Sequence, residues 1–327
     1  MNKLCLARRA LLAAAGTVVA GRAARAAYPD RPVRWIVGYA PGGGSDSAAR
    51  LLGTALSARL GQPVVVENRP GAATSIAAEA AARSAPDGYT LLTADNGTLV
   101  FNPVLYRRLP YEVDRDFRAV GLFARMDLVL VVKGGSDIRG AEAFIARARS
   151  APSSIDYASP GVGSPHHLAM ERLAREAGIR LNHVPYRGAA PALSDLLAGN
   201  VEAMMLDVPT GLEHLRGGSA IRPLAAASAR RLRILPGTPT LQELGQQGFE
   251  AFAWQALLAP AAVPEAVAAR LSEEFAAVLR DEAVGERLRA IGIEPNPGGP
   301  DAYAALLAAE RAAWVPLIRS LGITLDG

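Results

Sequence analysis

One local pattern occurs twice in this chain: an apolar strand-like run, a glycine-rich turn and a helical pattern. The first turn, Pro41-Gly42-Gly43-Gly44-Ser45-Asp46, follows a strand predicted at residues 33–39 and precedes a helix predicted at 47–60. Consecutive glycines bring bare backbone N–H groups close to a ligand, and the positive end of the helix dipole favours an anion there. The pattern therefore predicts a site for a carboxylate or a phosphate. A flexible turn with Ser45 or Asp46 as N-cap is the alternative.

The second copy is the turn at residues 159–165, which follows a strand predicted at 155–158. Ser164 can cap the next helix, and Pro165 suits the first helical position, where a missing N–H costs nothing. Gly178 is placed to end that helix. In an open α/β sheet, ligands bind beyond the carboxyl ends of the strands. Two such turns on two lobes would face each other across a cleft, and the alternative is that one of them is merely a turn.

Strand and helix patterns also alternate outside these turns. Over residues 33–94 the predicted order is strand, helix, strand, helix and strand, which favours a parallel sheet with helices on its faces. The apolar run at 128–132 is long enough to cross between lobes, and a helix is predicted at 141–150. The chain of 327 residues suits two lobes better than one. The remaining predicted elements of the first half are strands at 63–67 and 89–94 and a helix at 73–84.

Residues 1–27 have the pattern of an export signal. Lys3, Arg8 and Arg9 form a positive start, residues 10–20 are apolar, and Ala24-Arg25-Ala26 offers a small-x-small cleavage site. The apolar run is shorter than the roughly 20 residues that span a bilayer. We therefore expect a soluble mature protein in the periplasm, and the Arg8-Arg9 pair leaves twin-arginine export open.

Removal of this segment changes the charge balance. The whole chain has 35 Lys and Arg against 31 Asp and Glu, and the segment holds five of the basic residues, which leaves 30 basic against 31 acidic residues. A basic surface for nucleic acid is therefore not indicated. The only cysteine, Cys5, leaves with the segment, so the mature chain has no disulfides, thiolate catalysis or cysteine-ligated metal.

Several strings occur together that are specific in combination. They are Pro41-Gly42-Gly43 with Asp46, Glu67-Asn68-Arg69-Pro70-Gly71, Pro86-Asp87-Gly88-Tyr89-Thr90-Leu91-Leu92, Asn102-Pro103, Gly163-Ser164, His183-Val184-Pro185-Tyr186-Arg187-Gly188 and Leu235-Pro236-Gly237-Thr238-Pro239. With them the chain resembles the substrate-binding proteins of tripartite tricarboxylate transporters, the Bordetella uptake gene (Bug, TctC-like) proteins. The resemblance covers nearly the whole mature chain.

The resemblance implies an α/β fold of the type II periplasmic binding-protein kind, a two-lobed Venus flytrap with a mixed, mostly parallel sheet in each lobe. Lobe 1 would comprise residues 28–124 and 254–327, and lobe 2 residues 125–253, with crossover segments near 125–132 and 252–260. The implied function is capture of a small organic acid and its delivery to the large and small membrane subunits of a transporter. No cofactor, metal or catalytic residue is implied, and a monomer is expected.

Carried over by position, the resemblance also implies a set of ligand-binding residues, mostly acting through backbone groups. They are Gly42, Gly43, Gly44, Ser45 and Asp46 in the first turn, Thr93, Ala94, Asp95 and Asn96 after the third strand, and Gly161, Val162, Gly163 and Ser164 in the second turn. Tyr186 and Asp207 are additional candidates.

Three positions raise questions that the resemblance does not answer. Asp95 either faces the cleft, where it would repel a polyanion and favour a ligand with an amine or hydroxyls, or caps a turn. Arg187 either clamps a carboxylate or lies on the surface. The family's usual Gly-Ala-Gly-Gly is here Gly71-Ala72-Ala73-Thr74, which reduces backbone freedom.

Enzyme-like features are few. His166 and His167 are adjacent on a predicted helix, so they point in different directions and do not suit one metal ion. Ser164 lies in no nucleophile elbow, because proline follows it. Two alternatives to uptake stay open: the same fold as a ligand sensor for a membrane histidine kinase, and an exported hydrolase that depends on Ser164.

Overall fold

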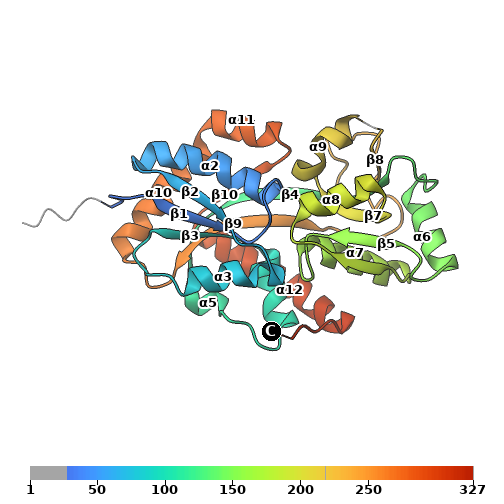
Figure 1. Ribbon diagram of the computed structural model, residues 1–327, viewed down its shortest axis with the longest axis horizontal. Coiled ribbons are helices and arrows are strands. Elements are labelled where there is room, and N and C mark those ends of the chain that lie inside the picture. The colour runs from blue at the N-terminus through green and yellow to red at the C-terminus, as the bar shows by residue number, and fades with distance from the viewer. Residues whose placement is uncertain (1–27, 218, 327) are drawn as a thin grey trace, which may run out of the picture.

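The computed structural model describes residues 28–217 and 219–326, so the predicted export signal lies outside the described residues. Two α/β lobes lie side by side along the long axis of the molecule (Figure 1). The prediction of a two-lobed α/β fold is confirmed. Within the described ranges, no helix combines the length and the apolar character needed to cross a membrane.

The first lobe is built on strands that order as β2 (Val64–Asn68), β1 (Val33–Val37), β3 (Thr90–Asp95), β9 (Phe252–Pro260) and the first part of β4 (Phe117–Lys133), with β10 (Glu294–Gly298) also paired to β4. The second lobe contains the last part of β4, β7 (Ala203–Asp207), β5 (Asp156–Ser159), β6 (Asn182–Pro185) and β8 (Ile221–Ala226). The sheet is mixed, since β1, β2 and β3 are parallel, as are β5, β6 and β7, whereas every pair with β4 or β9 is antiparallel.

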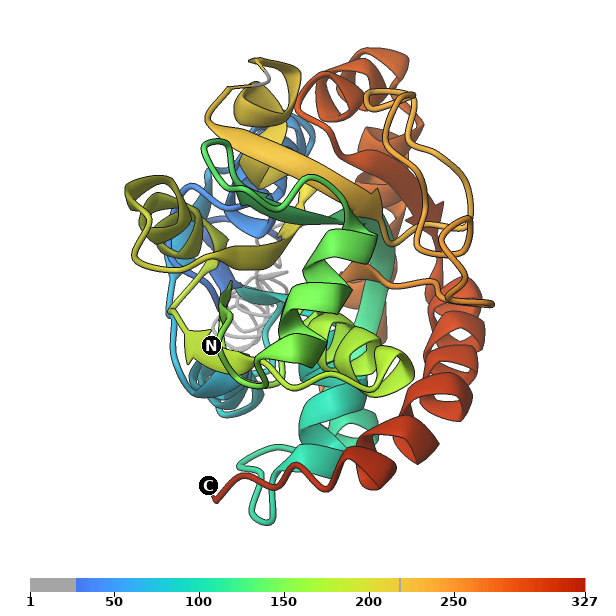
Figure 2. The same cartoon turned by 90° about the vertical axis from the view of Figure 1, so that its right-hand side faces the viewer.

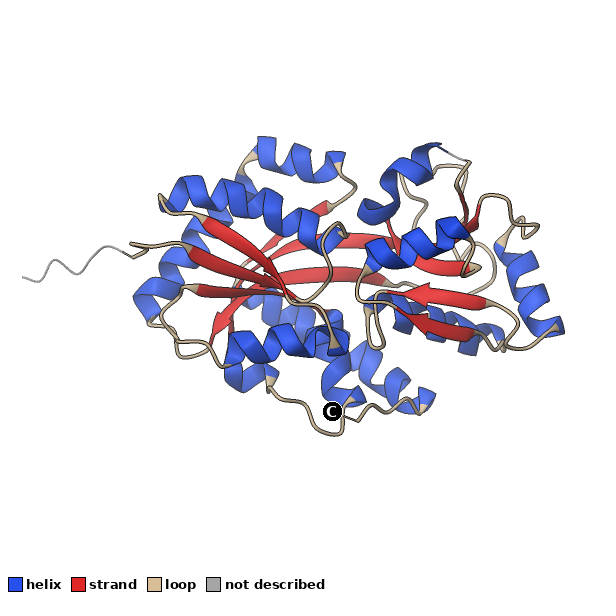
Figure 3. Ribbon diagram, viewed as in Figure 1, coloured by secondary structure: helices blue, strands red, loops and turns tan. Residues whose placement is uncertain are grey.

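Strand β4 connects the lobes. Residues 117–127 pair with β9, and residues 128–133 pair with β7 and β8, so its partners change after Asp127. The chain returns just before β9, where the N–H of Ala251 donates to the carbonyl of Ala227, whose own N–H donates to Leu128. Both passages lie near the predicted crossovers, while the lobe limits proposed from the sequence remain a prediction. Figure 3 shows the strands running through both lobes between helices on either side.

Helices cover both faces of each lobe (Figures 1 and 3). The first lobe carries α2 (Gly44–Leu60), α3 (Ser75–Ala82), α10 (Glu265–Arg280), α11 (Glu282–Ala290) and α12 (Pro300–Leu321), with the shorter turns η1 (Ala72–Thr74), η2 (Gly97–Phe101), α4 (Asn102–Leu105) and α5 (Val113–Asp116). The second carries α6 (Ala141–Ser150), α7 (Pro165–Ala177), α8 (Ala189–Ala198) and α9 (Val208–Gly217). Figure 2, a view from the side of the second lobe, shows α12 along the edge of the molecule.

Helix α7 forms as the sequence predicts. The Ser164 hydroxyl accepts a hydrogen bond from the N–H of His167, Pro165 is the first helical residue, and Gly178 ends the helix in the left-handed conformation. Helix α2 instead begins at Gly44, three residues earlier than predicted, and its N-cap is Gly43, which has no side chain to cap it. Ser45 and Asp46 are therefore not N-caps, contrary to the alternative reading.

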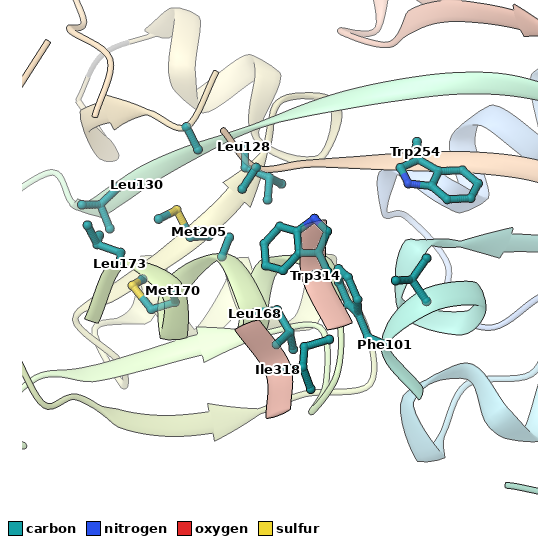
Figure 4. Close-up of a cluster of buried hydrophobic side chains, with 14 of the residues drawn as sticks. Phe101, Leu128, Leu130, Leu168, Met170, Leu173, Met205, Trp254, Trp314 and Ile318 are labelled. Atoms are coloured by element: carbon teal, nitrogen blue, oxygen red, sulfur yellow. The ribbon is translucent and has the colours of Figure 1, made fainter. Parts of the chain in front are cut away.

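An apolar cluster joins the lobes (Figure 4). Trp314 and Ile318 of α12 lie beside Phe101 of η2 and Leu168 of α7, so helices assigned to different lobes share one core. All three tryptophans are buried, Trp35 and Trp254 fully so.

Candidate ligand-binding cleft

The first turn leaves backbone donors open at the start of α2. Gly42, with φ +87°, adopts a conformation that suits glycine, and its N–H donates to the Asp46 carboxylate over 3.0 Å. The Gly44 N–H donates over 3.1 Å to the Thr210 hydroxyl of the second lobe. The N–H groups of Gly43, Ser45 and Asp46 donate to no acceptor in the described part of the chain. Unused amides at a helix N-terminus suit an anion.

The Asp46 side chain turns back into its own loop. Besides Gly42, it accepts hydrogen bonds from Arg50 at 3.0 Å and Asn68 at 2.9 Å. Burial raises the pKa of Asp46, but the hydrogen bonds from Arg50, Gly42 and Asn68 outweigh it and hold the pKa below its usual value. Asp46 therefore stays ionised and fixes the shape of the turn.

The second turn is closed by its own hydrogen bonds. The Gly163 N–H donates over 3.2 Å to Nδ1 of His167, and the Gly161 N–H donates over 3.1 Å to the Ser159 hydroxyl. Burial and the neighbouring His183 lower the pKa of His167 to about 3, so its ring is neutral and Nδ1 can accept. Together with the Ser164 cap, these contacts satisfy N–H groups of the second turn. Several N–H groups of the first turn have no such acceptor.

A small inner cavity lies where the lobes meet. The volume open to the centre of a water molecule is about 20 Å³. This is little more than the volume that a single water needs. The Gly44 N–H donates directly to Thr210 of the second lobe, and the Ala40 N–H donates over 2.9 Å to the carbonyl of Arg187, so the lobes are closed on each other. The cavity is lined by Tyr39, Gly43, Gly44, Ser45, Asp95, Met126, Pro160, His166, Ala189, Asp207, Ala253 and Gln255.

A larger outer cavity of about 470 Å³ shares Tyr39 and Pro160 with the inner one. Three predicted residues line it: Gly161, Val162 and Tyr186. The Tyr186 hydroxyl donates to Asp195 over 2.6 Å. Arg187 also lines this cavity, and its side chain is exposed.

Of the predicted ligand-binding residues, the structure brings Gly43, Gly44, Ser45, Asp95 and Asp207 together at the inner cavity. Thr93 lies in the core, where its hydroxyl accepts from the indole N–H of Trp35 over 2.7 Å, and Ala94 is fully buried beside it. The Asn96 amide donates to the carbonyl of Phe252 over 3.0 Å. The predicted residues that line neither cavity are Gly42, Asp46, Thr93, Ala94, Asn96, Gly163 and Ser164.

Asp95 caps a turn and also lies at the inner cavity, while its effect on a ligand stays a prediction. Its Oδ1 accepts from the N–H and the hydroxyl of Thr98, each over 2.8 Å, so it caps the η2 turn, and it also lines the inner cavity. Its Oδ2 accepts from the Tyr39 hydroxyl over 2.6 Å. Burial, together with the charge of Asp95, raises the pKa of Tyr39 well above its usual value, so Tyr39 remains a donor.

Asp207 lines the same cavity as Asp95, from the second lobe. Its Oδ1 accepts from the N–H and hydroxyl of Thr210, at 3.0 and 2.6 Å, and its Oδ2 lies 3.0 Å from Nε2 of His166. Burial raises the pKa of Asp207, but hydrogen bonds from His166 and Thr210 bring it below the usual value, so this buried carboxylate is ionised.

Sequence reasoning did not select Tyr39, His166, Thr210 or Gln255 for the site. Tyr39 lies two positions before the first glycine turn, at the end of the predicted strand, which is a signal that could have found it. Gln255 lies within an apolar strand and has no such signal, yet its amide donates to the Ser45 hydroxyl. Among the described residues, no three or more His, Cys, Asp or Glu side chains are grouped to hold a metal ion. His166 and His167 do point apart, toward Asp207 and Gly163 respectively.

The sequence matches the family model of the tripartite tricarboxylate transporter family receptor over residues 48–323. The chain belongs to this family. The chain is 37% identical over 318 residues to a UPF0065 protein encoded in the tcbD-tcbE intergenic region of Pseudomonas sp. (strain P51). The match covers 96% of this chain and 94% of the relative. It is 36% identical to protein BugT of Bordetella pertussis, covering 91% of each. The family consists of receptors.

Solved structures share the fold of this receptor. Rpa4515 of R. palustris with adipate superimposes with a TM-score of 0.87 at 33% identity, covering 92% of this chain and 100% of that one. MatC from Rhodopseudomonas palustris with bound malate gives a TM-score of 0.84 at 31% identity, covering 89% and 100%. The periplasmic binding protein BugD gives 0.86 at 31% identity, covering 92% and 100%.

Proposed function

We propose that this protein is a periplasmic receptor that captures a small carboxylate between its lobes and, as a monomer, delivers it to the membrane subunits of a tripartite transporter. The ligand carboxylate binds at the N-terminus of α2, where the N–H groups of Gly43 and Ser45 point to no protein acceptor. Closure of the lobes then adds contacts from the second lobe, including the Thr210 hydroxyl that already meets Gly44.

One observation carries this proposal: free amides at a helix N-terminus, at a cavity that both lobes line. Such amides stabilise an anion through hydrogen bonds and the helix dipole. Family membership and the two relatives with adipate and malate support an organic acid rather than a phosphate. Since ligand binds the closed form better than the open one, binding shifts the population toward the closed form that a membrane partner can recognise.

A thermal-shift screen of organic acids on the mature protein tests capture. A ligand at about 100 times its dissociation constant stabilises the native state by about 2.7 kcal/mol. We expect at least one small carboxylate to raise the melting temperature in a saturable way. If only phosphate esters or neutral solutes do so, carboxylate capture is wrong.

Delivery is tested in cells. We expect uptake of the radiolabelled acid to stop when the gene for this chain is deleted, and equally when the genes for the transporter's membrane subunits are deleted. Unchanged uptake, with loss of a ligand-dependent transcriptional response instead, would favour the sensor role.

A further inference from the structure

Two buried carboxylates from opposite lobes line the inner cavity. Asp95, at the end of β3, is 3% exposed, and Asp207, at the end of β7, is 2% exposed. Each accepts three hydrogen bonds, all from its own lobe. A carboxylate has about four lone-pair positions, so each can accept one more donor.

The lining of this cavity contains too little positive charge to balance them. Among the described residues that form it, there is no arginine or lysine, and its one histidine, His166, is hydrogen-bonded to Asp207 at 3.0 Å. Arg187 lies at the outer cavity and is exposed. A second carboxylate of a ligand would therefore be desolvated beside like charge.

Gln255 gives an independent indication that the ligand donates hydrogen bonds. This side chain is 1% exposed and lines the cavity, and its amide nitrogen donates to the Ser45 hydroxyl. Its Oε1 has no hydrogen-bond partner in the described chain, and neither has Nδ1 of His166, which lines the same cavity. A buried acceptor without a donor is costly, so these atoms favour a ligand that donates hydrogen bonds.

The cavity thus presents donors and acceptors together. The N–H groups of Gly43 and Ser45 have no acceptor in the described chain, and the carboxylates of Asp95 and Asp207 and the Oε1 of Gln255 belong to the same lining. Gln255 lies beside Ser45, and Asp207 lies beside Gly44. We infer that the ligand is a small zwitterion, an amino acid that enters while the lobes are parted, and whose carboxylate then meets the α2 amides while its ammonium group meets the buried carboxylates. This inference rests on the proposed capture of a carboxylate in this cleft, and it narrows the class to amino acids over di- and tricarboxylates.

Pairs of acids that differ only at one end test this directly. Isothermal titration calorimetry on the full mature protein compares 3-aminopropanoate with succinate, 4-aminobutanoate with glutarate, and 5-aminopentanoate with adipate, and α-amino acids with their deaminated counterparts. We expect the amino member of the best-binding pair to bind at least about tenfold more tightly, as the loss of a charge-assisted hydrogen bond implies.

Asp95→Asn then tests the residue. It should weaken binding of the amino acid by on the order of 10- to 100-fold and leave the matched dicarboxylate unchanged or tighter. Asp195→Asn is the control, because Asp195 accepts a tyrosine hydrogen bond of the same 2.6 Å length but does not line the inner cavity. The control should keep the native preference.

The outcomes separate the two proposals. If dicarboxylates bind more tightly than their amino counterparts, or if Asp95→Asn keeps the native preference, the zwitterion inference is overturned while carboxylate capture stands. If amines without a carboxylate bind as well as amino acids, carboxylate capture itself is wrong, and so is the zwitterion. If no member of the panel binds, both are contradicted. Should Asp95→Asn fail to fold, the ranking on the native protein decides alone.

Discussion

The two glycine-rich turns look alike in sequence and differ in what they leave free. At the first, the N-cap is Gly43, and the amides of Gly43 and Ser45 have no acceptor among the described residues. At the second, the Ser164 hydroxyl accepts a hydrogen bond from the N–H of His167, and Nδ1 of the His167 ring accepts one from the N–H of Gly163. The choice of capping residue therefore decides whether a helix N-terminus is available to a ligand or is already satisfied by the protein.

The largest expected effect is at the first turn. A methyl group at Gly44 would lie 2.7 Å from Pro209 and 2.8 Å from both Asp207 and Met126. Gly44→Ala should therefore oppose closure by about 1–3 kcal/mol, a loss of affinity on the order of 10- to 100-fold by calorimetry.

Gly53→Ala is the matched control for this change. It makes the same substitution in the same helix, but the added methyl would meet its nearest atom, in Val64, at an ordinary 3.5 Å. Native affinity is expected for Gly53→Ala. Equal ligand affinity of the two variants would mean that closure of the lobes does not require the close contacts at Gly44.

The turns should also differ in their response to acid. Burial lowers the pKa of His167 from 6.5 to about 3 in the folded protein. Below about pH 6.5 the unfolded chain therefore binds a proton that the folded chain does not, and the free energy of unfolding falls as the pH falls. The loss between pH 6.5 and 5 should be on the order of 1–2 kcal/mol. At the first turn, Asp46 has a lowered pKa, so its contribution is kept until the pH falls below its usual value near 4.

Calorimetric melting from pH 7 to pH 3 measures this difference. His167→Gln should make the decline above pH 4 shallower but not remove it, because burial also lowers the pKa of His183 to about 4. Asp46→Asn should change only the part below pH 4. A decline above pH 4 that is the same with and without His167 would contradict the role given to this histidine.

Next in size is the cap of the second turn. Ser164→Ala should cost about 1 kcal/mol of unfolding free energy in urea, the usual value of an N-cap side chain. Ligand affinity should stay within about twofold, because Ser164 lines neither cavity. Ser164→Asp should restore the stability. A large loss of affinity in Ser164→Ala, with stability intact, would instead make Ser164 a ligand contact.

The smallest effect concerns the segment beside the outer cavity, between the two turns. Ala72, Ala73 and Thr74 all have positive φ, +44°, +50° and +72°, which L-residues adopt at a cost. Ala73→Gly should therefore stabilise the protein by about 0.5–1 kcal/mol in urea unfolding. Ala80→Gly, inside α3, is the control and should destabilise by a similar amount. If both changes destabilise equally, the left-handed conformation at Ala73 carries no strain.

Local patterns predicted the parts of the site that are local. The glycine turns, the Ser164 cap and the end of β3 could be read from neighbouring residues, and they supply Gly43, Ser45 and Asp95 to the cavity or its surroundings. The start of α2 was placed too late because a glycine N-cap has no side chain to signal it.

The rest depends on distant parts of the chain. Gln255 lies 210 positions after Ser45 in the sequence. The two side chains meet only because β9 pairs with β3. Thr93 and Ala94 were selected with Asp95 because they adjoin it, but β3 is buried along its whole length and only its last residue reaches the inner cavity. Strand pairing, which the local sequence does not specify, decides both cases.

A crystal structure with the acid found in the screen tests the central claim most directly. We expect carboxylate oxygens about 2.7–3.2 Å from the amide nitrogens of Gly43 or Ser45, with the lobes closed around the ligand. A carboxylate held at the start of α7, with the Gly43 and Ser45 amides still facing no ligand, would contradict it.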